Sequence, residues 1–298
     1  MIFDTHAHVL SADTERYPHS TLRGGTRPPV PPMTFPVERL VEAMDAAGVA
    51  RACLVQRATL YGYDNSYVLR AVADHPERFR SVAVLDAQDR AAPATLSRLV
   101  RDHGLAGLRI VAPALDEHDT DWLASEQALE LWAAAADYGL PVAVILYRLN
   151  NDAGRAAMLR VARRFTTLPI VLDHCGVPHA STPETRWATS QGLDYTIAPP
   201  PGFGIAEALG KLAELPHVHF KVTDINFERL EDAGYSPAAF VGRLAGLVGA
   251  ERLIWGSDVG QSTTPYGEMV AKARHAAEDL GEAGRAAFLG GNAEGLYG

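Results

Sequence analysis

The feature that most constrains the fold is a regular alternation of apolar, strand-like runs with segments of helical periodicity along the chain. Eight strand-like runs can be distinguished, at residues 2–8, 51–56, 79–85, 105–111, 141–147, 169–174, 218–223 and 252–258. They are continuously apolar, which is typical of parallel strands covered on both faces. Eight such repeats predict an α/β fold, a closed (β/α)₈ TIM barrel that forms a single domain over residues 1–298.

The segments between these runs carry helical patterns or are rich in proline. Helices are expected at residues 37–48, 66–74, from 93 onward, and at 125–138, 153–164, 204–214, 237–248, 266–280 and 282–290. The connections 9–36 and 175–203 are longer than most loops, which indicates functional or disordered segments. The alternative is an open doubly wound sheet. It would place a glycine-rich turn after the first strand, where His6-Ala7-His8 stands instead.

Charge and cysteine content exclude several kinds of partner. The net charge is −9 without a block of Lys and Arg, which argues against a nucleic acid or an anionic membrane. Cys53 and Cys175 lack CxxC neighbours, so neither a disulfide framework nor a structural zinc site is expected. No signal peptide or transmembrane run is recognisable, and we therefore expect a cytoplasmic protein. The sequence leaves open whether it is a monomer or a homodimer.

Polar residues end several of the predicted strands, and the first of these strands ends in His6 and His8. An i, i+2 spacing places both imidazoles on one face of a strand. The later strands contribute Arg109, Tyr147, Arg148, His174, Lys221 and Asp258. Because catalytic residues of such barrels lie at the carboxyl ends of the strands, these side chains are expected to converge on one mouth.

These residues and their neighbours resemble the amidohydrolase superfamily and, within it, the branch of amidohydrolase-related, lactonase-like enzymes. The resemblance covers nearly the whole chain. Its motifs are Phe3-Asp4-Thr5-His6-Ala7-His8, Tyr17-Pro18, Gly107-Leu108-Arg109, Leu172-Asp173-His174-Cys175-Gly176, Phe220-Lys221, Trp255-Gly256-Ser257-Asp258 and Gly291-Asn292-Ala293. The order of the HxH, DHxG and GSD elements is fairly specific to the superfamily and less specific to the substrate.

The resemblance implies a hydrolytic barrel that opens lactone rings, like 2-pyrone-4,6-dicarboxylate lactonase and the sugar-acid lactonases. Its site combines His6, His8, His174 and Asp258, which hold one divalent metal ion, with zinc as the first choice. In other members these histidines polarise the carbonyl without a metal. Binuclear members carry a modified lysine on a middle strand, and residues 142–147 contain none, so we expect one metal ion at most.

Asp258 is the predicted general base, which takes a proton from the attacking water and returns it to the leaving alkoxide. Aspartate also favours helix N-caps, and that is the structural alternative for this residue. His6, His8 and His174 are predicted to bind the metal or to stabilise the oxyanion. A core histidine with satisfied hydrogen bonds is the alternative for His174.

Three further residues are predicted to contact the substrate. Arg109 is unexpected in an apolar strand; it either holds a substrate carboxylate as a fork or forms a structural ion pair. Tyr147 is preferred to Arg148, because one strand cannot point both neighbours inward. For Lys221, pairing with a barrel carboxylate and contact with the substrate are weighed equally.

We therefore expect a hydrolase that opens the lactone ring of a small, carboxylate-bearing substrate. The alternative is a metal-dependent decarboxylase of an aromatic or muconate-type acid, because the same four ligands serve both reactions. Two segments depart from the pattern usual in the family: Thr223-Asp224 after the strand-seven lysine, and Val259-Gly260-Gln261 after Asp258. Both lie at the predicted mouth, so the substrate is expected to differ from those of better-known members.

Overall fold

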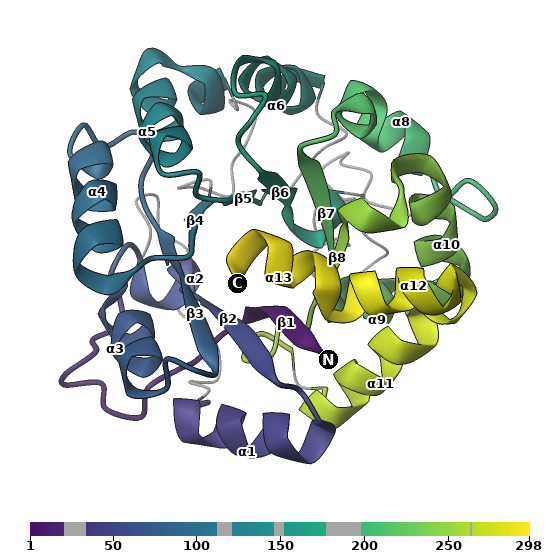
Figure 1. Ribbon diagram of the computed structural model, residues 1–298, viewed down its shortest axis with the longest axis horizontal. Helices are drawn as coiled ribbons and strands as arrows, with labels where there is room; N and C mark the ends of the chain where they lie inside the picture. Colours follow the sequence, from purple (N-terminus) through teal and green to yellow (C-terminus); the bar gives the residue numbers. More distant parts are fainter. Residues whose placement is uncertain (21–33, 112–120, 146–151, 177–197, 263) are drawn as a thin grey trace, which may run out of the picture.

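The computed structural model describes residues 1–20, 34–111, 121–145, 152–176, 198–262 and 264–298. Within these residues eight parallel strands follow one another around a single sheet in chain order. The strands are β1 (Phe3–Ala7), β2 (Arg51–Val55), β3 (Phe79–Val84), β4 (Gly107–Ile110), β5 (Val142–Val144), β6 (Ile170–Leu172), β7 (Val218–Thr223) and β8 (Leu253–Gly256). Helices surround the strands as an outer ring (Figure 1). The predicted TIM barrel is confirmed.

The last strand meets the first, and this contact nearly closes the barrel. The backbone N–H of Asp258 donates to the carbonyl of His6 at 2.7 Å, and the N–H of His8 donates to the carbonyl of Val259 at 2.9 Å. Gly256 permits the close approach, since a Cβ there would lie 2.4 Å from the Cβ of His6. The chain segments that carry the two histidines and Asp258 are therefore direct neighbours.

The helices agree with the expected positions to within a few residues. They are α1 (Val37–Ala47), α2 (Ala58–Tyr61), α3 (Ser66–Asp74), α4 (Ala92–His103), α5 (Glu126–Asp137), α6 (Asp152–Arg164), α8 (Ile205–Leu209), α9 (Asp224–Asp232), α10 (Pro237–Val248), α11 (Tyr266–Ala276), α12 (Gly281–Ala286) and α13 (Asn292–Tyr297). The sequence did not predict α2, α9 or α13, and α13 lies across the barrel and not in the outer ring. Helix α9 begins directly at the end of β7 through a capping box of Thr223 and Asn226, so no loop separates the two elements. Within the described residues no helix is long and apolar enough to cross a membrane.

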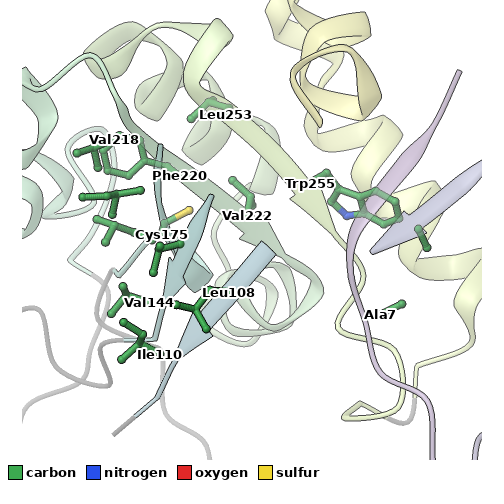
Figure 2. Close-up of a cluster of buried hydrophobic side chains, with 14 of the residues drawn as sticks. Ala7, Leu108, Ile110, Val144, Cys175, Val218, Phe220, Val222, Leu253 and Trp255 are labelled. Atoms are coloured by element: carbon green, nitrogen blue, oxygen red, sulfur yellow. The ribbon is translucent and has the colours of Figure 1, made fainter. Parts of the chain in front are cut away.

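The main hydrophobic core lies between the strands and the helices. It includes Leu108, Val144, Phe220, Leu253 and Trp255, which are fully or almost fully buried. Figure 2 shows part of this core, with Leu108, Val144 and Phe220 in one group and Trp255 further along the ring of strands. Trp255, which begins the family motif that ends in Asp258, belongs to this core.

A second, smaller apolar cluster fills the amino-terminal end of the barrel interior. Phe3, Cys53, Val82 and Ile254 come from the strands, and Tyr297 comes from α13. In Figure 1, α13 lies across the middle of the ring of strands. Its Tyr297 ring fits against Gly107, where an added Cβ would lie 3.1 Å from Tyr297 Cε1. Cys53 is a buried core residue, and this end of the barrel is closed by apolar packing.

Candidate active site

The two strand-one histidines and Asp258 form a buried cluster at the carboxyl end of the barrel. Asp258 Oδ1 lies 3.1 Å from His8 Nε2 and 3.6 Å from His6 Nε2. The three ligand atoms lie within 4.8 Å of one another, and all three side chains are almost inaccessible to solvent. The structure therefore brings together three of the four residues that were predicted to act together.

Asp258 owes its position to an unusual backbone conformation. Its φ of 60° lies in the left-handed region, which aspartate tolerates better than most residues. The next helix, α11, begins only at Tyr266 and is preceded by Pro265. Asp258 is consequently not the cap of that helix, and the structural alternative considered for it is wrong.

Hydrogen bonds orient the two strand-one imidazoles differently. His8 Nδ1 lies 2.7 Å from the carbonyl oxygen of Val55, which can only accept, so Nδ1 carries a hydrogen. His6 Nδ1 lies 3.3 Å from Lys221 Nζ and 3.7 Å from Asp173 Oδ1. Both rings thus present Nε2 to Asp258.

His174 reaches the site from the tight turn Asp173–Gly176 that follows β6. His174 and Cys175 both have left-handed backbones, with φ of 54° and 56°. The carbonyl of His174 accepts from Asn226 Nδ2 at 3.0 Å, and its Nδ1 lies 2.7 Å from Thr223 Oγ1. Its Nδ1 is 3.9 Å from Asp258 Oδ2, so His174 lies beside the cluster of His6, His8 and Asp258.

Thr223 links His174 to Asn226. Asn226 Oδ1 accepts from the Thr223 backbone N–H at 2.9 Å and from the Thr223 hydroxyl at 3.3 Å. The single hydroxyl hydrogen serves either Asn226 Oδ1 or His174 Nδ1, and the tautomer of His174 differs between the two cases. Thr223, one of the departures from the family pattern, is therefore a positioning residue for this imidazole.

A buried carboxylate, Asp173, gathers the two cations that the sequence placed on β4 and β7. Its Oδ2 accepts from Arg109 Nε at 2.8 Å, and its Oδ1 lies 2.9 Å from Lys221 Nζ. Lys221 and Asp173 are essentially inaccessible, and Arg109 is buried. For Lys221, the structure shows pairing with a barrel carboxylate. Arg109 forms the structural ion pair, and its contact with a substrate stays a prediction.

A second buried carboxylate, Asp4, supports the site from behind. It accepts hydrogen bonds from the Ser257 hydroxyl at 2.6 Å, the Ser257 N–H at 2.8 Å, the His6 N–H at 2.9 Å and the Tyr266 hydroxyl at 3.1 Å. Burial raises the pKa of Asp4, and these four donors partly offset the rise. Asp4 therefore ties the end of β1 to the segment that carries Asp258.

Burial and charge set the protonation states around the cluster. Burial lowers the pKa of His6 well below its ordinary value, with a further contribution from the Lys221 charge, and burial lowers the pKa of His174 to about 4. Burial alone would raise the pKa of Asp258, but the surrounding imidazoles outweigh it and hold the pKa below the usual range. At neutral pH the site therefore contains a carboxylate and neutral His6 and His174 rings.

Some predicted residues lie outside the described part of the chain, and others were not predicted at all. Tyr147 and Arg148 fall in 146–151, so their roles stay predictions. Sequence reasoning did not single out Arg57 and Asn226, and it assigned no individual role to Asp4 and Asp173 within the family motifs or to Thr223 at the predicted mouth. Their common signal is a polar residue within an apolar strand or within three residues of its end.

The donor set fits a divalent metal ion. His8 Nε2 faces a carboxylate oxygen at 3.1 Å while Nδ1 carries the ring hydrogen. Two lone pairs at this distance repel each other unless a proton or a cation lies between them. Within the described residues, the buried atoms His6 Nε2 and Asp258 Oδ1 make no hydrogen bond. Zinc–nitrogen and zinc–oxygen bonds of about 2.0–2.2 Å place tetrahedral ligands roughly 3.4 Å apart, close to the observed 3.1 and 3.6 Å.

The family profile described as amidohydrolase matches residues 3–298, and the chain belongs to this family. It is 27% identical over 259 residues to the 4-sulfomuconolactone hydrolase of Hydrogenophaga intermedia, over 86% of this chain and 73% of that protein. It is 29% identical over 276 residues to the L-fucono-1,5-lactonase of Burkholderia ambifaria, over 88% of this chain and 85% of that protein. The resemblance to the lactonase-like branch is confirmed.

Solved structures share the fold. A Pseudomonas putida protein assigned as a 2-pyrone-4,6-dicarboxylic acid hydrolase superposes with a TM-score of 0.74 at 24% identity, over 99% of this chain and 97% of that chain. A 2,6-dihydroxybenzoate decarboxylase from Rhizobium superposes with a TM-score of 0.67 at 16% identity, over 99% and 98% of the two chains. The same barrel therefore occurs in enzymes named for hydrolysis and for decarboxylation.

Proposed function

We propose that this protein hydrolyses the ring ester of a small lactone, with Asp258 as the general base. The observation that carries the proposal is a buried carboxylate held between two imidazoles at the carboxyl end of a barrel. Active sites of such barrels lie at this end. The lactone-hydrolysing names of the two relatives described above support the choice of reaction.

The reaction needs a base that is ionised at neutral pH. The depressed pKa of Asp258 provides that state. Asp258 takes a proton from water as the water oxygen bonds to the lactone carbonyl carbon. The ring C–O bond then breaks, and the same proton passes from Asp258 to the leaving alkoxide. The product is an open-chain hydroxy acid, so atoms and charges balance without a further reactant.

His6, His8 and Asp258 would hold the metal ion, with His174 as the predicted fourth ligand. Bound there, a divalent ion supplies Lewis acidity that polarises the carbonyl and the attacking water. We propose zinc, because nitrogen and carboxylate ligands in this combination suit it.

The hydrogen bonds are compatible with a metal-bound and with a metal-free arrangement. His8 carries its ring hydrogen on Nδ1, so its Nε2, when the ring is neutral, offers a lone pair that binds a cation but cannot donate to a carbonyl oxygen. A metal-free site needs a hydrogen on at least one Nε2. His6 carries it there when its Nδ1 accepts from Lys221 Nζ at 3.3 Å, so activity after metal removal decides between the two arrangements.

A substrate screen separates the hydrolase from the decarboxylase alternative. Purified protein is incubated with five- and six-membered lactones and with aromatic and muconate-type acids. Ring opening is followed by acid release and product mass, and decarboxylation by carbon dioxide. We expect ring opening without carbon dioxide. Decarboxylation of the acids with no lactone opened would contradict the proposal.

The metal assignment has its own measurement. Elemental analysis of the purified protein is expected to give close to one zinc per chain, and chelation should abolish activity that added zinc restores. Matched His8→Gln and His75→Gln variants separate the site from adventitious surface binding, because His75 lies outside it at the end of α3. Unchanged activity in fully metal-depleted protein would exclude a metal-dependent mechanism.

The remaining assignments concern the binding partner, the cellular location and the oligomeric state. The family acts on small molecules, which agrees with the expected partner. The cytoplasmic location and the choice between monomer and homodimer stay predictions.

A further inference from the structure

The described part of the chain buries three arginine and lysine side chains, and one of them differs from the other two. Arg109 and Lys221 share the carboxylate of Asp173. Arg57 is also buried, with 7% of its surface exposed. Within the described ranges no carboxylate forms an ion pair with Arg57. Burying a charge without a counter-charge is costly, so this residue calls for an explanation.

Arg57 lies at the mouth of the barrel beside the histidine–aspartate cluster. It follows β2 by two residues, and it continues the inward alternation of Cys53 and Val55, which line the barrel interior. Its guanidinium donates to the carbonyl of Gly260, two residues beyond Asp258. Since β1 lies between β2 and β8, this side chain passes over the end of β1, where His8 stands.

The remaining donors of Arg57 are available to a ligand. The bond to Gly260 uses Nη1, and Nε is a buried donor without a hydrogen-bond acceptor in the described structure. The carboxylate of Asp258 forms no ion pair with Arg57 and is in contact with His6 and His8. Burial lowers the pKa of Arg57, and the Asp258 charge partly offsets this. The guanidinium nevertheless stays charged at neutral pH, because arginine is too basic to lose its proton in a protein.

We propose that Arg57 binds the acidic substituent of the substrate, and that the enzyme therefore acts on anionic lactones in preference to neutral sugar lactones. The inference rests on the proposed lactone hydrolysis and adds the substrate class. A carboxylate or a sulfonate would supply the missing counter-charge, and the low exposure of Arg57 would strengthen the pair. This role was expected of Arg109, whose Nε is already bonded to Asp173.

If Arg57 only held the segment around Gly260 in place through its hydrogen bond, its loss would have a different effect. Such a loss would disturb the site for every lactone. Losing an anion-binding residue weakens only anionic substrates. The test therefore compares a carboxymethyl butenolide with its methyl ester and with the matching sulfonate, in the wild type, Arg57→Met and Arg57→Gln. Arg70→Met is the matched control, because Arg70 is an exposed residue of α3 that pairs with Asp74.

We expect Arg57→Met to lower kcat/KM for the anionic butenolides by about 10–100-fold, mainly through KM, as for loss of a charge-assisted hydrogen bond. The value for the methyl ester should stay within about twofold of the wild type. Arg57→Gln keeps a donor for Gly260 and should behave alike, which covers the case that Arg57→Met does not fold. The ratio between carboxylate and sulfonate identifies the natural acid. An equal loss on anionic and neutral lactones would overturn the proposal.

A binding measurement decides the matter even if no lactone is hydrolysed. Glutarate and ethanesulfonate are added separately, and the unfolding temperature is recorded. Either anion should raise it in the wild type and Arg70→Met, and the rise should be absent in Arg57→Met and Arg57→Gln. A rise of the same size in all variants, or none in the wild type, would refute the role of Arg57. Failure of lactone hydrolysis alone would instead refute the proposed function.

Discussion

The two ends of the barrel interior are built from the same strands but hold opposite kinds of side chain. At the amino-terminal end, β4 contributes Gly107 and β6 contributes Val171, packed with Tyr297 or its apolar neighbours. Two residues further along the same strands stand Arg109 and Asp173, which form an ion pair. An i, i+2 step keeps a side chain on the same face, so the contrast is one of depth within the barrel.

The comparison shows that the amino-terminal end of the barrel contributes to stability and the carboxyl end holds the groups of the candidate active site. The apolar end needs only volume and shape, and its residues gain free energy by leaving water. At the carboxyl end, three buried carboxylates each have partners: Asp173 with two cations, Asp258 with the histidines, and Asp4 with four donors. Isosteric substitutions that change polarity without volume should therefore have large effects at one end and small effects at the other.

The largest effect is expected for Asp258→Asn. The amide occupies the same volume but cannot accept a proton from water, so kcat on the best lactone should fall by at least about 10²-fold. The circular dichroism spectrum should stay that of the wild type. Asp102→Asn, an exposed carboxylate at the end of α4, is the control and should leave kcat unchanged. Near-normal turnover of Asp258→Asn would show that the base lies elsewhere.

The second effect concerns stability. Asp173→Asn leaves Arg109 and Lys221 buried without their shared anion, which should lower the free energy of unfolding by about 3–5 kcal/mol. Asp74→Asn breaks the exposed pair with Arg70 and should cost at most about 1 kcal/mol. Urea unfolding of both variants measures the difference. Equal small losses would mean that the ion pairs of Asp173 contribute nothing beyond those of a surface pair.

The pH dependence of that difference follows from the pKa of Asp173. Burial alone would raise this pKa, but the Lys221 and Arg109 charges outweigh it and hold it well below the ordinary value of 3.8. A depressed folded-state pKa means that the stabilising charge is fully present above the unfolded value and is lost as the pH falls through the folded value. The gap between the wild type and Asp173→Asn should therefore be the same at pH 7 and pH 5.

The sequence predicted the barrel because eight apolar runs alternate regularly with helical segments. The predicted bounds of β7 and α10 agree with the observed bounds at both ends. It also predicted the cluster of His6, His8 and Asp258, because strand ends of a barrel meet at one rim. Strand parity could have identified Asp173, which continues the inward face of Val171. The sequence also placed His174 at this rim, and the structure has it beside the cluster. The orientation of its ring could not be predicted, because it depends on two consecutive left-handed residues.

The sequence also could not predict which distant residues form ion pairs or hydrogen bonds with each other. Arg109 and Lys221 were singled out as charges within apolar strands, but their common partner Asp173 had no assigned role. The pairing depends on which inward positions share a level of the barrel, and that depends on register between β4, β6 and β7. The same limit applies to Arg57, whose contact with Gly260 joins residues 203 positions apart.

The smallest effect is expected at the apolar end, for Tyr297→Phe. The Tyr297 hydroxyl is a buried polar atom for which the described residues offer no hydrogen-bond partner. Its removal should leave the free energy of unfolding unchanged or raise it by up to about 1 kcal/mol, because a buried group without a partner gains nothing from its polarity.

The matched variant is Tyr266→Phe, which removes a hydroxyl that donates to Asp4 at 3.1 Å. That loss should cost about 1–3 kcal/mol, since it leaves a buried carboxylate short of a donor. Urea unfolding measures both, and kcat/KM should stay unchanged in Tyr297→Phe. If Tyr297→Phe were the more destabilising of the two, the apolar end of the barrel would hold a polar interaction of its own.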